Sequence, residues 1–137
     1  MTTFVAVTEV PQAGEFCQLR VDGGLSAMDT EAAAVALPNS LFATTIRDND
    51  RLIAMARVVG DGLHVMITDV VVHPGYQGQG LAKKLLDRVI EFVDNELPSC
   101  AWVNLFADVD WLYGKYGFEV NTTSIGMTRP RNYEPAT

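Results

Sequence analysis

The spacing of apolar residues changes several times along the chain, and each change marks a predicted element. Short apolar runs rich in β-branched residues are typical of strands, and apolar residues recurring every three or four positions are typical of an amphipathic helix. The pattern predicts strands at 15–21, 41–47, 52–59, 63–72, 100–106, 118–121 and 124–129, and helices within 23–38, 81–97 and 108–117. This order predicts a mixed α/β sheet with an antiparallel meander before the central helix.

Two segments define the centre of this predicted fold. The run 63–72 is almost entirely apolar, as expected for a central strand covered on both faces. In the following segment, Leu81, Leu85 and Val89 lie on one helical face, and charged residues occupy the other. Pro98 ends this helix. In the earlier helix, within 23–38, either Ser26 or Asp29 can cap the N-terminus.

The length and composition predict one domain over residues 1–137. The chain is long enough for one core and too short for two, and 48% of its residues are hydrophobic. No apolar run reaches the ~20 residues that span a bilayer, and the N-terminus lacks the features of a secretory signal. We therefore expect a cytoplasmic protein without a membrane partner. Cys17 and Cys100 lack metal-ligand spacing and are interpreted as small buried residues rather than a disulfide or reactive thiol.

The charge of the chain bears on its partners. The formal net charge is −7. This value argues against a nucleic-acid partner, because neutralising phosphates requires clustered Lys and Arg. It is compatible with a small cationic substrate attracted by the protein's field, although solubility alone can also explain it.

The segment "VVVHPGYQGQGLAKKLL" at 70–86 places three glycines where a strand gives way to a helix. The first N–H groups of a helix lack backbone partners, and together with the positive helix end they favour an anion. Glycine lets a phosphate approach the backbone without a Cβ in the way. Lys83 and Lys84 add positive charge one turn further on. The segment therefore predicts a pyrophosphate site, and the alternative is a tight corner that binds nothing.

Two familiar phosphate-binding motifs do not fit this turn. Gly75 and Gly80 have the spacing of a Walker A motif, but Leu81 stands where that motif requires Lys. Gly78 and Gly80 fit the start of a dinucleotide-binding fingerprint, but Lys83 occupies the position of its third glycine.

The turn is instead similar to the signature of the GNAT superfamily of acyl-CoA-dependent N-acyltransferases, [Q/R]-x-x-G-x-[G/A]. It reads Gln77-Gly78-Gln79-Gly80-Leu81-Ala82 here, after the strand-like "VVVHP". A second family feature is an aromatic residue four positions before a Gly-Phe pair, represented here by Tyr113 and Gly117-Phe118. The resemblance covers about residues 15–129 and points to a bacterial subgroup of unassigned substrate. It implies a mostly antiparallel sheet flanked by helices, with a V-shaped splay between two central strands.

The resemblance also implies which residues bind acetyl-CoA, the expected cosubstrate. The backbone amides of Gln77, Gly78, Gly80, Leu81 and Ala82 would bind the pyrophosphate, with Gln79 and Lys83 in the same turn. Val70 and Val72 would pair through their backbone with the pantetheine arm. One departure from the family is Phe106, which stands where many members have Asn.

For catalysis, the resemblance implies that Tyr113 is the general acid that protonates the leaving thiolate. The alternative interpretation is that Tyr113 is only a half-buried aromatic residue of the helix. Tyr116, one helical turn further on, is interpreted as a residue with a packing role. Asp69 is a candidate general base, because it lies inside an apolar strand where burial can perturb a carboxyl pKa. A structural role for Asp69 stays open, and so does deprotonation of the amine through water. A structural role is favoured over a catalytic one for four further titratable residues, His64, His73, Asp108 and Asp110.

These residues together predict an N-acetyltransferase that transfers the acetyl group from acetyl-CoA to a primary amine by direct attack. The amine belongs to a small molecule or a peptide, and a homodimer is possible. One alternative is a non-catalytic acyl-CoA sensor or scaffold with the same fold. Another is an unrelated nucleotide- or phosphosugar-binding α/β protein.

Overall fold

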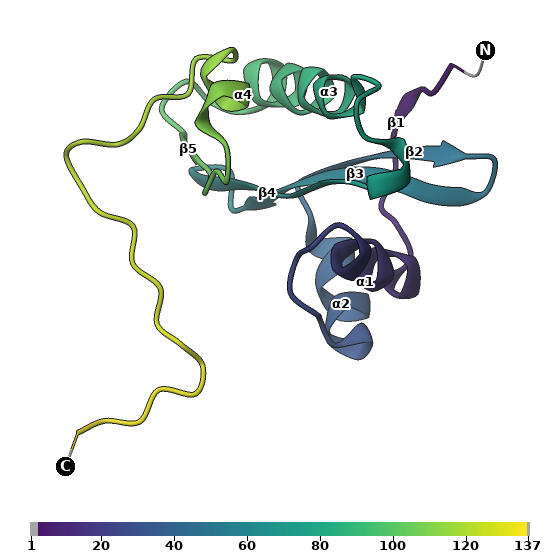
Figure 1. Ribbon diagram of the computed structural model, residues 1–137. Coiled ribbons are helices and arrows are strands. Elements are labelled where there is room, and N and C mark those ends of the chain that lie inside the picture. Colours follow the sequence, from purple (N-terminus) through teal and green to yellow (C-terminus); the bar gives the residue numbers. More distant parts are fainter. Residues whose placement is uncertain (1–2, 137) are drawn as a thin grey trace. The chain divides into compact units, whose positions relative to one another are not determined.

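The computed structural model describes residues 3–136, and its strands form one mixed sheet (Figure 1). The strands are β1 (Ala6–Thr8), β2 (Phe42–Asp48), β3 (Arg51–Gly60), β4 (His64–Val72) and β5 (Trp102–Asn104), and they lie in the order β1-β2-β3-β4-β5. Neighbouring strands run antiparallel except β4 and β5, which are parallel. This arrangement confirms the predicted mixed α/β fold and its antiparallel meander.

Helices cover both faces of this sheet. The long helix α3 (Leu81–Glu96) lies on one face, and α1 (Ala13–Asp22) and α2 (Thr30–Ala36) lie on the other (Figure 1). The short 3-10 helix η1 (Leu37–Asn39) follows α2, and a second, η2 (Pro74–Tyr76), follows β4. The core between the sheet and α1–α2 includes Phe16, Leu19, Leu37, Met55 and Val71. On the other face, α3 buries Leu81, Leu85, Leu86 and Val89, as its apolar spacing predicted.

The described residues divide into two compact units, one that ends at Phe106 and one that begins at Ala107. The first contains the sheet, α1 to α3 and both 3-10 helices, and the second contains α4 (Asp110–Gly114). A single domain over 1–137 stays a prediction.

Two predictions at the N-terminal end were wrong. The run 15–21 is part of helix α1 rather than a strand, and the first strand is β1, which the apolar pattern did not single out. The missed signal is a capping box, in which the backbone N–H of Gln12 donates to Glu15 Oε2 at 3.0 Å. Burial of Phe16, Leu19 and Arg20 at helical spacing then outweighs the β propensity of the run. For α2, Asp29 is the cap, because its carboxylate accepts from the N–H of Ala32 at 2.9 Å.

The predicted closing strands at 118–121 and 124–129 were also wrong, because the described residues there form no strand. A strand needs a partner for its backbone groups, and this segment instead makes local bonds. The side chain of Asn121 accepts from the N–H groups of Thr123 at 2.9 Å and Ser124 at 3.1 Å. Such Asx turns compete with strand pairing. Val120, Ile125 and Met127 remain exposed in this segment.

The two cysteines have different environments. Cys17 is buried in the core on α1, as predicted, but Cys100 is exposed, so its prediction was wrong. Among the described residues, no helix is both long enough and apolar enough to cross a bilayer.

An ion-pair network ties α1 to β2 and leads to a prediction about acid stability. Arg47 donates to Glu15 at 2.6 Å and to Glu9 at 2.9 Å. The hydrogen bond with Arg47 is the main cause that lowers the pKa of Glu15, although burial opposes it. A carboxyl with a lowered folded-state pKa stabilises the fold above its unfolded pKa, and this stabilisation is lost as the pH falls through the folded value.

Glu15→Gln is therefore expected to lower the free energy of unfolding by about 1 kcal/mol at pH 7. The difference from wild type should shrink below the ordinary Glu pKa and disappear in stronger acid. Denaturant melts at several pH values measure it, with exposed Asp94→Asn as the control. An equal difference at all pH values would contradict this assignment.

Candidate functional site

The C-terminal half of β4 has an open backbone edge, because no strand among residues 3–136 pairs with it on that side. The pairing of β4 with β5 extends only from His64–Trp102 to Met66–Asn104, although β4 continues to Val72. This short pairing agrees with the predicted divergence of two neighbouring strands. The N–H of His73 donates to the carbonyl of Ile53 on β3 at 2.7 Å. Because backbone groups alternate in direction along a strand, the N–H groups of Val72 and Val70 face away from β3. They therefore lie on the open edge.

The glycine turn begins where this edge ends. Gly78 and Gly80 have φ angles of 81° and 77°, in the left-handed region that favours glycine. Gly80 is the N-cap of α3 and has no side chain that could make a capping hydrogen bond. The first N–H groups of the helix, at Leu81 and Ala82, therefore receive no side-chain cap from Gly80. A Cβ built on Gly78 or Gly80 meets nothing within 4 Å. The exposed backbone of this turn can therefore be approached closely by a ligand.

Side chains around the turn hold its shape. His73 Nδ1 accepts from the N–H of Gly75 at 3.0 Å, and His73 Nε2 lies 3.1 Å from Arg51 Nη2. This agrees with the interpretation of His73 as a residue that shapes the turn. Gln77 Nε2 donates to the carbonyl of Val72 at 3.1 Å and so ties the turn back to the end of β4.

The two lysines of α3 differ in their contacts. Lys84 Nζ donates to the carbonyl of Phe4 at 2.5 Å, so its charge is held against the N-terminal segment. Lys83 Nζ lies 2.9 Å from Asp87 Oδ2 in an exposed i,i+4 ion pair. Lys83 is thus the more accessible of the two positive charges near the turn.

Asp69 lies in a β-bulge of β4. Met55 pairs with Val71 and Arg57 pairs with Thr68, so Asp69 and Val70 together face a single residue of β3. The φ angle of Asp69 is 54°, which is uncommon outside glycine. Its side chain is 4% exposed, and Arg20 and Arg57 each contact one of its carboxylate oxygens. Because both oxygens are engaged by guanidinium groups, the geometry favours the structural role for Asp69 over the general base.

Sequence reasoning did not include Arg20 and Arg57 among the candidates. Arg20 was assigned to a predicted strand, and Asp69 lies 49 positions further along the sequence, so their contact was not predicted. A usable signal was present in Arg57, which interrupts an otherwise apolar strand and therefore requires a buried partner.

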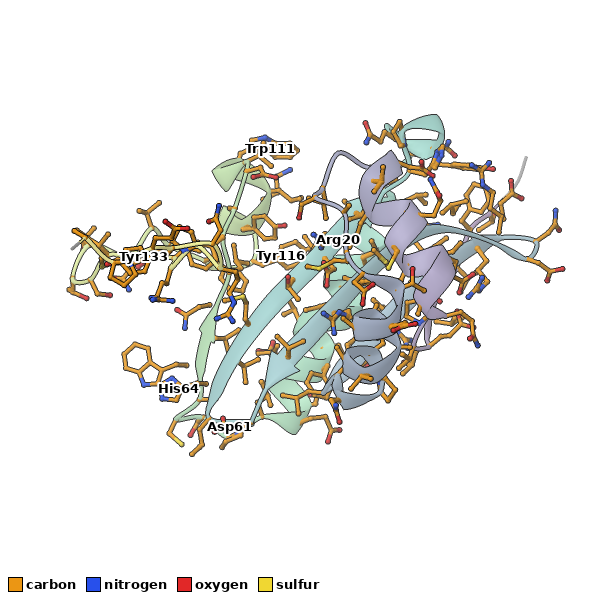
Figure 2. All side chains as sticks on the ribbon, turned by 90° about the horizontal axis from the view of Figure 1, so that it is seen from below. Arg20, Asp61, His64, Trp111, Tyr116 and Tyr133 are labelled. Carbon is orange, nitrogen blue, oxygen red and sulfur yellow. The ribbon has the colours of Figure 1, made fainter. Side chains whose placement is uncertain are left out.

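The surroundings of His64 agree with its interpretation as a structural residue. His64 lies at the turn between β3 and β4, beside Asp61 (Figure 2). Asp61 Oδ1 accepts from the N–H groups of Leu63 at 2.8 Å and His64 at 2.9 Å. These bonds to backbone N–H groups lower the pKa of Asp61 and close the turn.

Tyr113 lies in the second unit, on α4. Its ring packs edge-on against Phe118, with ring centroids 6.3 Å apart. The carbonyl of Tyr113 accepts from the N–H groups of Tyr116 at 2.9 Å and Phe118 at 3.3 Å, and Gly117 has a φ angle of 87° at the end of this turn. Partial burial, followed by the negative charge of Asp108, raises the pKa of Tyr113. Its phenol is therefore protonated at neutral pH, as a general acid must be.

Comparisons with known proteins identify the family. A family model described as the acetyltransferase (GNAT) domain matches residues 39–120. The probable acetyltransferase TAP2 of Glycine max is 32% identical over 123 residues, which cover 79% of this chain and 48% of that protein. The chain therefore spans about half the length of this curated relative.

Solved structures support the same family. A Staphylococcus aureus protein of unknown function, SA2161, described as a probable acetyltransferase, is 36% identical with a TM-score of 0.87, covering 93% of this chain and 99% of that one. A predicted acetyltransferase from Clostridium acetobutylicum, solved with acetyl-CoA, shares the fold at 19% identity and a TM-score of 0.69, covering 93% of this chain and 96% of its own. The family match spans the meander, the glycine turn, α3 and Tyr113, and the chain belongs to the GNAT family of acetyltransferases.

Proposed function

We propose that the protein is an N-acetyltransferase that transfers the acetyl group of acetyl-CoA directly to a primary amine. The observation that carries this proposal is the juxtaposition of the open β4 edge and the exposed glycine turn at the start of α3. An extended pantetheine arm needs a row of backbone groups, and a pyrophosphate needs uncapped N–H groups beside it. Family membership supports the same cosubstrate.

The residues divide into two coenzyme-binding sets. In the first, the β4 backbone at Val70 and Val72 pairs with the pantetheine arm, with the Val72 N–H on an amide group of the arm and the Val70 N–H at its thioester end. In the second, the backbone amides of the turn bind the pyrophosphate, with Gln79 at its exposed surface and the Lys83 ammonium adding charge. The amides of this second set belong to Gln77, Gly78, Gly80, Leu81 and Ala82. The left-handed conformation of Gly78 and Gly80, with open space around each, supports this assignment.

The transfer step requires an acid and a stabilised oxyanion. The amine nitrogen attacks the thioester carbonyl carbon, and a β4 amide donates to the oxygen as negative charge develops on it. The carbon–sulfur bond then breaks, and the thiolate takes a proton from the Tyr113 phenol. Thiols of this kind have a pKa of about 8 to 9, so a phenol is a suitable donor. The proton released by the amine passes to water, and water returns a proton to the Tyr113 phenolate. The transfer to water is consistent with the engagement of Asp69 by two arginines.

The acceptor is proposed only as a primary amine on a small molecule or peptide. The formal charge of −7 is consistent with a cationic substrate. A cytoplasmic location, the absence of a nucleic-acid partner and a possible homodimer stay predictions.

Acetyl-CoA is expected to raise the melting temperature of the protein. Ligand at a hundredfold excess over Kd stabilises the native state by about 2.7 kcal/mol. Thermal melts with acetyl-CoA, ATP and NAD measure this effect, and only acetyl-CoA should produce it. A melt unchanged by millimolar acetyl-CoA would refute the proposal.

Coenzyme A release with a panel of amines then tests turnover. Release that depends on the amine is expected for a transferase. Binding of acetyl-CoA without release on any amine would indicate the sensor or scaffold instead.

A further inference from the structure

We infer that Arg20, Asp69 and Arg57 form a positioning cluster that holds the β4 bulge and thereby directs the Val70 amide toward the reacting carbonyl. This inference rests on the proposed acetyl transfer. It assigns the three side chains a role in kcat although none of them belongs to the two proposed coenzyme-binding sets. We call these three residues the arginine–aspartate cluster.

The arginine–aspartate cluster joins three elements at one buried point. Arg20 lies on α1 (Figure 2), and it contacts Asp69 Oδ1 on β4. Arg57 comes from β3, and its Nε donates to Asp69 Oδ2 at 2.8 Å. Both guanidinium groups also lie near the ring of Phe16, at 6.0 Å for Arg20 and 5.4 Å for Arg57. The carboxylate at the bulge is therefore held from two directions.

Arg20 and Arg57 also donate hydrogen bonds to the segments that precede and follow α2. Arg20 donates to the carbonyl of Ser26 at 3.1 Å and to its hydroxyl at 3.0 Å, in the loop that leads to α2. Arg57 donates to the hydroxyl of Ser40 at 3.0 Å, at the end of η1. Fixed guanidinium geometry makes such multiple contacts directional. The bulge and both flanks of α2 are thus one connected unit.

The bulge itself explains why a carboxylate is needed there. Asp69 has a positive φ, which costs free energy in a residue with a Cβ and persists only where the surroundings impose it. The paired carboxylate supplies that constraint. The next residue is Val70, whose N–H lies on the open edge and is the nearest β4 amide to the bulge. A shift of the bulge would therefore change the direction of the proposed oxyanion donor without removing the coenzyme's pyrophosphate site.

Arg57→Lys tests this role while keeping the charge of the cluster. We expect kcat to fall by about 10- to 100-fold, as misdirected donors and small displacements typically cause. The Kd for coenzyme A should stay within about threefold of wild type, because the glycine turn is untouched. Arg47→Lys is the matched control, since Arg47 also pairs with two carboxylates but on the β1 side of the sheet. It should leave kcat unchanged. Should Arg57→Lys fail to fold, Arg20→Lys weakens the same cluster from the other oxygen.

A second readout needs no substrate. The NMR amide resonances of Val70 and Val71 should shift in Arg57→Lys and stay in place in Arg47→Lys. A wild-type kcat in a folded Arg57→Lys or Arg20→Lys protein, or unmoved bulge amides, would overturn the inference. If the wild type releases no coenzyme A in response to any amine, the proposed function is refuted instead. The NMR comparison of the Val70 and Val71 amides would still decide whether the cluster holds the bulge.

A base role for Asp69 predicts a different result. In that case Asp69→Asn would abolish amine-dependent turnover, whereas Arg57→Lys would retain it. For a positioning cluster, Asp69→Asn and Arg57→Lys should each lower kcat, and their effects should be strongly non-additive.

Discussion

Tyr113→Phe is expected to lower kcat by about 10²–10⁴-fold, the usual contribution of a positioned general acid. The substitution removes one hydroxyl and keeps the ring, so the edge-on contact with Phe118 should survive. The coenzyme A affinity should change little, because the proposed pyrophosphate amides lie in the glycine turn. Single-turnover and steady-state release of coenzyme A measure the loss.

The pH dependence provides a second test of Tyr113. Burial and Asp108 raise the pKa of its phenol above the ordinary value of 10.0. The acid is therefore present at neutral pH, and kcat should fall only as the pH rises through the raised pKa. This alkaline limb should vanish in Tyr113→Phe.

Tyr116→Phe is the matched control for the same helix-terminal turn. It should retain turnover close to wild type. A larger loss in Tyr116→Phe than in Tyr113→Phe would assign the acid to Tyr116. Near-wild-type turnover in Tyr113→Phe would show that Tyr113 is structural and that water or another residue protonates the thiolate.

Gly80→Val is expected to weaken acetyl-CoA binding by at least about 100-fold, the equivalent of one or two lost charge-assisted hydrogen bonds. A Cβ at this position meets no protein atom within 4 Å, so the substitution fills the space that the pyrophosphate would occupy. The φ angle of 77° also strains a β-branched residue, which adds a cost to folding. Binding must therefore be compared with thermal stability.

Gly62→Val separates the two effects. Gly62 lies in the turn between β3 and β4, has a φ angle of 97° and also has no atom within 4 Å of a built Cβ. Its substitution carries a similar strain far from the proposed site in the sequence. We expect both variants to lose stability and only Gly80→Val to lose acetyl-CoA binding. Normal binding in a folded Gly80→Val protein would contradict the pyrophosphate assignment.

The sequence by itself determined the elements whose signals are local. The apolar spacing of α3 and the nearly unbroken run of β4 each depend on residues close together in the chain, so these elements were predicted at nearly their observed bounds. The glycine turn was predicted for the same reason, because uncapped helix amides and permissive φ angles are properties of a short segment.

Tertiary structure decided what depends on distant partners. The run 15–21 has strand-like composition, yet burial of its helical face against β3 and β4 makes it α1. The closing segment has strand-like spacing, yet no strand forms there among the described residues. Asp69 was ambiguous between base and structural residue until two arginines from other elements were placed on its oxygens. A buried charge takes its role from the groups that compensate it, and only the folded chain brings those groups together.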